Sequence, residues 1–392
     1  MIKRELSNKL IYYASIYPVV SITGPRQSGK TTLVKQTFSD YEYITLEDID
    51  TRNIAINDPK TILETKAKGL VIDEIQRVPE LFSYIQGIVD KTNKAGQFII
   101  TGSQNFLLME NISQTLAGRI AILKLLPFSI EELKNTDKFS GNFTNAIYNG
   151  AYPRIYDKNI LAKDFYPFYI QTYVERDVKL IKNINNHNAF INFIKICAGR
   201  TGQLLNISEL ANTCGITQIT AKSWLSILEA SYIIYFLQPY HKNYNKRIVK
   251  MPKLYFYDTG LASSILGIKS EKQLITHFLY GALFENFIIN EFYKFLYNNS
   301  IDLNLYFWRN KNAKEIDLII DNNNEVIPIE IKAGKTFNYD FLKNLNYWKK
   351  ISNNDNSFVI YGGDKTYKTK DTNIISWKNL TSILDKILNI NN

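Results

Sequence analysis

The sequence predicts an α/β protein whose first part is built on a parallel, doubly wound sheet. An apolar run at residues 19–23 leads into a loop with glycine at both ends and then into a helical pattern. Further apolar runs at 70–72, 97–101 and 120–126 alternate with helical stretches. This alternation is typical of βαβ units, which place parallel strands in one sheet with helices on its faces.

The loop after the first run reads Gly-Pro-Arg-Gln-Ser-Gly-Lys-Thr over residues 24–31. The spacing G-x-x-x-x-G-K-T is that of a phosphate-binding P-loop, in which glycines let backbone N–H groups converge and a helix N-terminus faces the anion. A turn that binds nothing is disfavoured, because strand, loop and helix follow in the expected order. The predicted nucleotide-binding residues are Gly24, Pro25, Arg26, Gln27, Ser28, Gly29, Lys30, Thr31 and Thr32.

Within this loop, Lys30 supplies a full charge for the β- and γ-phosphates, and the Thr31 hydroxyl is a candidate Mg²⁺ ligand. Asp73 and Glu74 follow the run 70–72. At the carboxyl end of a buried parallel strand, Asp73 lies beside the metal and Glu74 can polarise the attacking water. The alternative is a strand that runs into an acidic turn. A metal explains the pair better, since buried carboxylates without a cation are costly.

Other polar residues border the next two apolar runs. Ser103 follows 97–101 and could sense the γ-phosphate, although a helix N-cap is an equally simple role. Arg119 precedes 120–126 and could act on phosphate charge in its own or a neighbouring subunit. The alternative for Arg119 is an ion pair with an acid. Arg176 is a second candidate, for which a local ion pair is the favoured interpretation.

A chain of 392 residues is too long for one typical core. We predict domains at 1–135, 146–253 and 254–392, the first two separated by the polar stretch 134–145. The middle domain is expected to be helical, with a winged-helix segment.

That segment lies at residues 204–239, which predict a helix-turn-helix followed by the first strand of a wing. Ser208 and Thr217 are candidate helix caps, and Gly215 allows the turn. In a DNA complex the major groove would be contacted by Gln218, Lys222 and Ser223. The single lysine on this face favours protein contacts instead.

The third domain carries a pattern of metal-dependent nucleases. Asp317 lies in a predicted strand at 315–320, and Glu330 and Lys332 lie in the next, at 326–332. Alternation places Glu330 and Lys332 on one face, where the acids could share a divalent ion and the lysine could steady a phosphate. Glu285, in a predicted helix, is a further candidate. The alternative is an exposed face with an ordinary ion pair.

Composition sets wider limits. Apolar residues make up 45% and charged residues 21%, as in globular proteins. The net charge of +10 supports a nucleic-acid partner only weakly, because a lysine- and asparagine-rich composition raises it without selection. No apolar stretch approaches the ~20 residues that span a bilayer, and the N-terminus has no signal-peptide pattern. We therefore expect a cytoplasmic protein without a membrane partner.

With these motifs the chain resembles prokaryotic AAA-type P-loop ATPases that carry a C-terminal restriction-endonuclease-like domain of uncharacterised function. The resemblance implies a P-loop NTPase sheet, a helical and winged-helix segment, and a small mixed α/β nuclease-like domain. It also implies ATP and Mg²⁺ as cofactors, with nucleotide or metal roles for Lys30, Thr31, Asp73 and Glu74. The residues that carry it are 24–33, 71–76, 100–103, 116–119, 283–286, 315–317 and 329–332.

These observations lead to a first hypothesis of a Mg-dependent ATPase that works as a switch or motor, with DNA as a candidate partner. A second hypothesis is an ATP-gated, metal-dependent DNA nuclease. A third is a non-enzymatic, nucleotide-dependent regulator that binds DNA or protein. A homo-oligomer is a candidate assembly, since an arginine such as Arg119 can act across subunits.

Overall fold

The computed structural model describes residues 2–64, 67–103, 114–134, 136–174, 186–241, 251–322, 325–352, 356–369 and 371–387. The chain forms two compact units. The first comprises Met1–Phe128, Ala230–Tyr232 and Tyr297–Ile301, and the second comprises Ser129–Glu229, Ile233–Leu296 and Asp302–Asn392.

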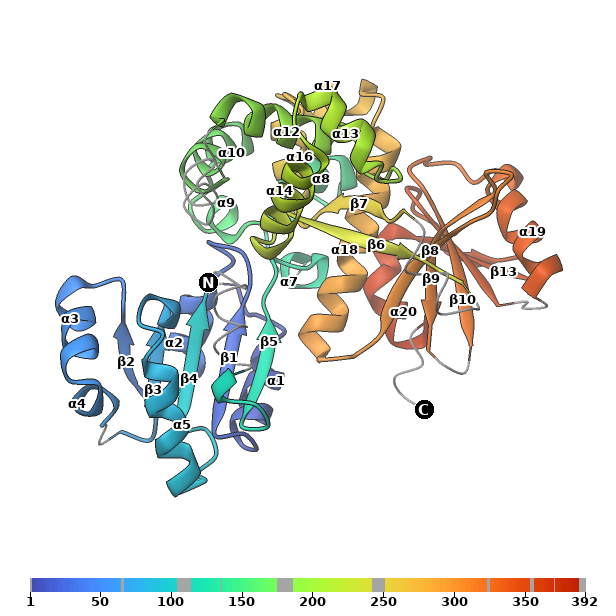
Figure 1. Cartoon of the computed structure of the whole chain (residues 1–392). Helices are drawn as coiled ribbons and strands as arrows, with labels where there is room; N and C mark the ends of the chain where they lie inside the picture. The colour runs from blue at the N-terminus through green and yellow to red at the C-terminus, as the bar shows by residue number, and fades with distance from the viewer. Residues whose placement is uncertain are drawn as a thin grey trace. The chain divides into compact units, whose positions relative to one another are not determined.

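The first unit is built on a parallel sheet of five strands in the order β2-β3-β4-β1-β5 (Figure 1). This arrangement confirms the predicted α/β fold. Every residue of β1, β3 and β4 is buried, as expected for parallel strands covered on both faces. The strands are β1 (Val19–Thr23), β2 (Glu42–Thr45), β3 (Leu70–Asp73), β4 (Phe98–Gly102) and β5 (Ile120–Lys124).

Helices pack on both faces of this sheet. Val19 lies in one hydrophobic cluster with Phe82 of α5, whereas the next residue, Val20, lies in another with Leu10 of α1. Successive strand residues point to opposite faces, so each face has its own core. The helices are α1 (Ser7–Ala14), α2 (Lys30–Thr37), α3 (Ile49–Asn57), α4 (Pro59–Leu63) and α5 (Leu81–Thr92), with the 3₁₀ helix η1 (Ile75–Arg77).

The second unit contains a mixed sheet of eight strands in the order β12-β13-β11-β10-β9-β8-β6-β7. β9 is antiparallel to β8 and β10, whereas β10, β11 and β13 run parallel. The strands are β6 (Ile234–Pro239), β7 (Lys253–Phe256), β8 (Asn304–Arg309), β9 (Glu315–Asp321), β10 (Val326–Lys332), β11 (Ser357–Tyr361), β12 (Tyr367–Lys368) and β13 (Thr372–Ser376).

The strand predicted to begin a wing is β6, and its placement differs from that of a free wing. It pairs with β7 on one side and, through Gln238 and Pro239, with β8 on the other. The predicted domain boundary between residues 253 and 254 falls inside β7, within the same sheet. An apolar strand bordered by turns contains no signal for which sheet it joins, since pairing is decided by distant residues.

Helices make up most of the rest of the second unit. They are α7 (Ile130–Lys134), α8 (Phe143–Asn149), α9 (Pro153–Asp157), α10 (Ala162–Tyr169), the π-helix η2 (Ile170–Val174), α12 (His187–Gly199), α13 (Ile207–Cys214), α14 (Gln218–Ala230), α16 (Thr259–Ile265), α17 (Glu271–Thr276), α18 (Tyr280–Asn299), η3 (Tyr339–Leu342), α19 (Lys343–Ser352), η4 (Trp377–Asn379) and α20 (Leu380–Ile387).

The two helices predicted for the helix-turn-helix are α13 and α14, with Gly215 at φ 65° in the turn between them. Thr217 caps α14 by accepting the N–H of Thr220 over 3.1 Å. Asn206, not Ser208, caps α13, because its side chain accepts the N–H of Glu209. The predicted cap Ser208 is instead the second residue of the helix, two residues after the N-cap position.

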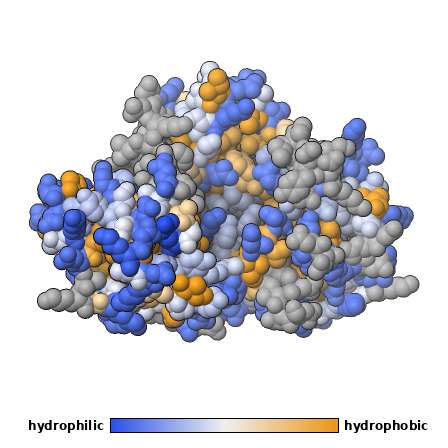
Figure 2. Space-filling view, turned by 60° about the horizontal axis from the view of Figure 1, so that its bottom comes forward, coloured by the Kyte–Doolittle hydropathy of each residue, from blue (hydrophilic) through white to orange (hydrophobic). Residues whose placement is uncertain are grey.

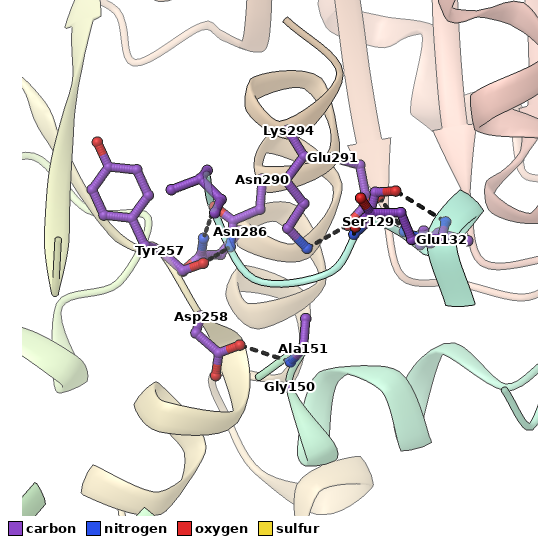
Figure 3. A network of polar contacts seen from close by, with 12 residues as sticks. Ser129, Glu132, Gly150, Ala151, Tyr257, Asp258, Asn286, Asn290, Glu291 and Lys294 are labelled. Carbon is purple, nitrogen blue, oxygen red and sulfur yellow. Dashed lines mark hydrogen bonds and ion pairs between the residues drawn. The ribbon is translucent and has the colours of Figure 1, made fainter. Parts of the chain in front are cut away.

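Buried polar side chains of α18 organise the second unit (Figure 3). Asn286 accepts the backbone N–H of Phe256 over 3.0 Å and donates to its carbonyl over 2.8 Å, so its amide completes the edge of β7. Glu291 accepts the N–H of Ile130 and the ammonium of Lys294, both over 2.7 Å. These bonds attach β7 and α7 to one helix.

On the face drawn in Figure 2, hydrophilic residues cover much of the described surface and hydrophobic ones form separate patches. Such scattered apolar residues are usual on folded domains. Within the described part of the chain, no helix combines the length and apolarity needed to cross a membrane.

Candidate functional site

The P-loop connects β1 to α2 and takes a conformation that its glycines permit. Gly24 has φ 147° and Gly29 has φ 93°, both in the region that other residues resist. A Cβ on Gly24 would collide with the carbonyl oxygen of Leu125. Glycine is therefore required at Gly24 for close approach to the chain after β5, and at Gly29 for the turn into the helix.

Lys30 is the first residue of α2, and its side chain folds back into the loop. Its ammonium donates to the carbonyl oxygens of Gly24, over 3.0 Å, and Pro25, over 2.8 Å. Burial lowers the pKa of Lys30 to about 8, and the charges of Glu74 and Asp73 oppose that shift only in part. The buried cation thus lies inside the loop that is predicted to hold phosphate, bonded to two of its carbonyl oxygens.

The other predicted loop residues have distinct surroundings. Gln27 is exposed at φ 60°, and Thr32 is exposed on α2. Arg26 is half-buried. Ser28 is buried, and its hydroxyl makes no hydrogen bond to any described residue. An orphaned hydroxyl inside this loop fits a ligand that would complete its bonding.

Asp73 is the last residue of β3, and its carboxylate accepts hydrogen bonds from the hydroxyl groups of three neighbouring elements. Oδ2 accepts from Thr31 over 2.9 Å and from Tyr43 over 2.7 Å. Oδ1 accepts from Thr101 of β4. Because α2, β2 and β4 each supply one donor, the carboxylate is fixed at the carboxyl edge of the sheet, beside the start of α2.

Glu74 and Ser103 also meet at this edge. Ser103 donates to Oε2 of Glu74 over 3.0 Å, and Gln76 donates to the same oxygen. Glu74 adopts the left-handed conformation, with φ 57°, which few residues other than glycine and asparagine adopt at low cost. The sequence-predicted residues Lys30, Thr31, Asp73, Glu74 and Ser103 therefore gather around one end of the sheet.

Arg4, which the sequence did not predict as a site residue, supports the P-loop. Its guanidinium donates to the carbonyls of Ser28 and Leu126, each over 2.6 Å, and lies over the ring of Phe128. Arg4 is only 5% exposed. Tyr43, which donates to Asp73, was likewise not predicted from the sequence. A basic residue near the N-terminus or a tyrosine in an edge strand contains no local signal for these contacts.

Arg119 lies at the opposite end of the sheet from the P-loop. It precedes β5, whose last residue, Lys124, pairs with Thr23 just before the loop. Five strand residues span ~16 Å. The guanidinium instead forms an ion pair with Asp90, with Nη2 3.2 Å from Oδ2. This geometry favours the structural alternative, and a role across subunits stays a prediction. Arg176 lies outside the described residues.

The predicted nuclease-like residues come together in the second unit. β9 and β10 are antiparallel, and the Lys332 ammonium lies 2.9 Å from Asp317 Oδ2 and 2.8 Å from Glu330 Oε1. The backbone N–H of Ile331 also donates to Asp317. Glu330 is 2% exposed, and its Oε2 has no partner among the described residues. Burial and the charge of Asp317 raise the pKa of Glu330 to about 8.

Glu285 belongs to a neighbouring charge cluster that includes a lysine not predicted as a site residue. Lys253 of β7 is 2% exposed and forms ion pairs with Glu285, over 3.0 Å, and Glu315, over 2.5 Å. Burial raises the pKa of Glu285, while Lys253 opposes the shift. Among the described residues, no group of three or more Asp, Glu, His or Cys side chains has metal-site geometry.

Comparison with known proteins gives a family match for the first part of the chain. Residues 17–134 match a family described as an AAA domain. Together with the parallel sheet and the loop between β1 and α2, this match identifies an AAA-type P-loop fold. Residues 140–272 and 280–380 match two domains of unknown function, DUF8612 and DUF4143. The restriction-endonuclease-like character of the C-terminal part therefore stays a prediction.

The chain is similar to an uncharacterized protein of Mycobacterium tuberculosis, at 29% identity over 322 residues, covering 81% of this chain and 71% of the relative. A relative from Methanocaldococcus jannaschii is 26% identical over 376 residues, covering 86% and 79%. Among solved structures, a Walker-type ATPase of Pyrococcus abyssi matches with a TM-score of 0.47 at 15% identity, covering 68% of this chain and 96% of that one. AMPPCP-bound DnaA of Aquifex aeolicus matches at 0.31 and 15%, covering 57% and 85%.

Proposed function

We propose that the first unit binds Mg-ATP and hydrolyses it, and that the chain works as an ATP-dependent switch or motor. The observation that carries the proposal is the hydrogen bond from Thr31 to Asp73. It brings a hydroxyl and a carboxylate oxygen, both ligands of the kind that Mg²⁺ prefers, next to Lys30 at the helix N-terminus.

The residues present fit these cofactors. The orphaned hydroxyl of Ser28 and the buried ammonium of Lys30 support a phosphate position inside the P-loop. When bound, Mg²⁺ neutralises phosphate charge. In our proposal Lys30 and the loop N–H groups hold the phosphates, while Thr31 and Asp73 provide the metal ligands. Glu74 accepts a hydrogen bond from water, and Ser103 orients the Glu74 carboxylate.

Nucleotide binding and ATP turnover in matched variants test this proposal. We expect Lys30→Ala to lose nucleotide binding, because it removes the buried cation. Glu74→Gln should keep binding and slow hydrolysis about 100-fold or more, the usual cost of losing a general base. Lys91→Ala, an exposed lysine of α5, is the control and should behave like the wild type. Full ATPase activity in Lys30→Ala would contradict the proposal.

The same proposal includes two partners, DNA and further copies of this chain. The ATPase assay with and without DNA tests whether DNA stimulates turnover, as expected for a motor on DNA. A mass measurement with and without ATP tests whether copies of the chain assemble, which a role of Arg119 across subunits requires. A monomer under every nucleotide condition would leave Arg119 with its structural ion pair to Asp90.

Glu330 favours a second candidate function, metal-dependent DNA cleavage in the second unit. Its Oε2 is buried without a partner, while Oε1 is held by Lys332 and Asn344. Plasmid DNA incubated with Mg²⁺ or Mn²⁺ should then be cut by the wild type and not by Lys332→Ala. The Lys30→Ala variant separates ATP gating from the cleavage itself. Intact plasmid under all conditions would argue that Glu330 and Lys332 are structural.

A further inference from the structure

Three aromatic rings gather in the second unit, on the segments that precede α19 and β13 in the chain. The Phe337 ring centroid lies 5.4 Å from that of Tyr339 and 5.6 Å from that of Tyr367. Tyr339 is 75% exposed and Tyr367 is 40% exposed. Single exposed rings are common on folded domains, but here two exposed tyrosines contact the same Phe337 ring and so form one aromatic cluster.

The segments that carry these rings are held in place by packing and by hydrogen bonds. Phe337 and Phe341 pack against the hydrophobic cluster that includes Leu342 and Trp348. Asn338 caps η3 by accepting the N–H of Asp340 over 2.9 Å, which fixes the backbone of Tyr339. Tyr367 lies in β12, which is paired to β13. The exposed faces are therefore presented by ordered backbone, so little entropy is lost when a ligand stacks on them.

Two lysines lie within two residues of these rings along the chain. Lys335 and Lys365 are exposed, and neither forms an ion pair with a described residue. The acids nearby are already paired, Asp340 with Lys343 over 2.9 Å and Asp364 with Lys378 over 2.7 Å. The positive charge of these two lysines is thus available to an anionic ligand.

The two lysine-bearing loops are also fixed to one another. The N–H of Gly362 donates to the carbonyls of Lys332, over 3.0 Å, and Gly334, over 3.2 Å. A Cβ on Gly363 would collide with the carbonyl of Lys335, and the Tyr361 hydroxyl donates to the carbonyl of Lys365 over 2.8 Å. The lysines therefore project from a rigid base at the carboxyl end of β10.

We infer that this aromatic-lysine surface, made of Lys335, Phe337, Tyr339, Lys365 and Tyr367, binds a single-stranded polynucleotide. Exposed aromatic faces stack on unpaired bases of any sequence, and adjacent cations bind the phosphates between them. In a duplex the bases are already stacked and paired, so the rings would have no base face to contact. The inference is independent of ATP binding, because every residue that carries it lies in the second unit.

Fluorescence anisotropy with labelled oligonucleotides tests the inference, with no nucleotide present. We expect single-stranded DNA or RNA to bind more tightly than a duplex of the same length. Parallel titrations with single-stranded DNA and single-stranded RNA identify which of the two binds more tightly. Tyr339→Ala should weaken binding about tenfold, or ~1.4 kcal/mol, from lost stacking. Lys365→Gln should lower the slope of log affinity against log salt by ~0.7, the contribution of one phosphate contact.

Matched controls are available elsewhere in the same unit. Phe278→Ala removes a ring that is 80% exposed, and Lys272→Gln removes an exposed lysine of α17. Both should bind like the wild type, and thermal unfolding should show all four variants folded. Equal binding by Tyr339→Ala and wild type, tighter binding to duplex, or no saturable binding at low salt would each overturn the inference.

Discussion

Thr31 Oγ1 donates a hydrogen bond to Asp73 Oδ2 over 2.9 Å, which joins the first turn of α2 to the end of β3. The hydroxyl of Tyr43 donates to the same oxygen over 2.7 Å. A metal that binds here must therefore replace or rearrange two hydroxyl donors at one carboxylate oxygen. Metal binding and the packing of three elements around Asp73 are coupled for that reason.

Asp73→Asn should remove the effect of Mg²⁺ on nucleotide affinity while leaving the fold intact. The asparagine carbonyl can still accept from Thr31 and Tyr43, but it lacks the charge that a divalent ion needs. Calorimetric titration with ATP should show affinity in EDTA within about twofold of wild type and a loss of about tenfold or more with Mg²⁺. Asp40→Asn, at an exposed acid of the same unit, is the control. A normal Mg²⁺ response in Asp73→Asn would reject the metal role.

Nucleotide affinity should fall as the pH rises through about 8, because burial lowers the pKa of Lys30 to about 8. Above that pH the free protein loses the ammonium charge, so the apparent dissociation constant should rise about tenfold per pH unit. Lys30→Arg stays charged across this range and should show a flat profile. Titration of a fluorescent ATP analogue from pH 7 to pH 10 measures both. Parallel profiles for the two proteins would contradict the prediction.

The same pKa has a consequence for stability. The lysine pKa is lowered in the folded state from 10.5, so between about 8 and 10.5 the unfolded chain binds more protons. The free energy of unfolding of wild type should therefore increase over this window relative to Lys30→Met. Below about 8 both states are protonated, and the burial penalty is constant. Urea unfolding at several pH values measures the difference.

Gly24→Ala should destabilise the first unit and abolish nucleotide binding. Its φ of 147° and the approach of the Leu125 carbonyl leave no room for a methyl group. We expect a loss of ~2–4 kcal/mol in the free energy of unfolding, as for other overpacked or strained sites. Gly87→Ala is a matched control, because nothing lies near its Cβ position in α5, and it should stabilise by ~0.5–1 kcal/mol. Equal effects at both glycines would contradict this account.

Lys253→Met should be strongly destabilising, by ~3–5 kcal/mol, because it leaves Glu285 and Glu315 without their buried cation. Adding Glu285→Gln should recover part of the loss, since Glu315 keeps its ion pair with Arg309. Denaturant unfolding of the single and double variants measures the coupling. Lys349→Met breaks an exposed pair with Asp371 and should change stability by less than ~1 kcal/mol. Additive single effects would show that Lys253 and Glu285 do not interact.

The parts of the candidate site predicted from the sequence are those fixed by local patterns. Gly24, Lys30 and Thr31 follow from the spacing of one loop, and Asp73 follows from its place after an apolar strand. Arg4 and Tyr43 were not predictable in this way. Their contacts cross 24 and 30 residues of sequence, and which distant atoms meet depends on how helices and strands pack.

The sequence by itself determined the parallel sheet and the composition of its P-loop, because hydrophobic period and glycine spacing act over a few residues. It also determined which acids and lysines share the strands β9 and β10. Only the tertiary structure decided that β6 joins the eight-stranded sheet, that Arg119 pairs with Asp90, and that Tyr339 and Tyr367 meet on one surface. The reason is physical. Strand partners, ion pairs and ring contacts depend on the free energy of packing the whole chain, and no single segment of the sequence contains that information.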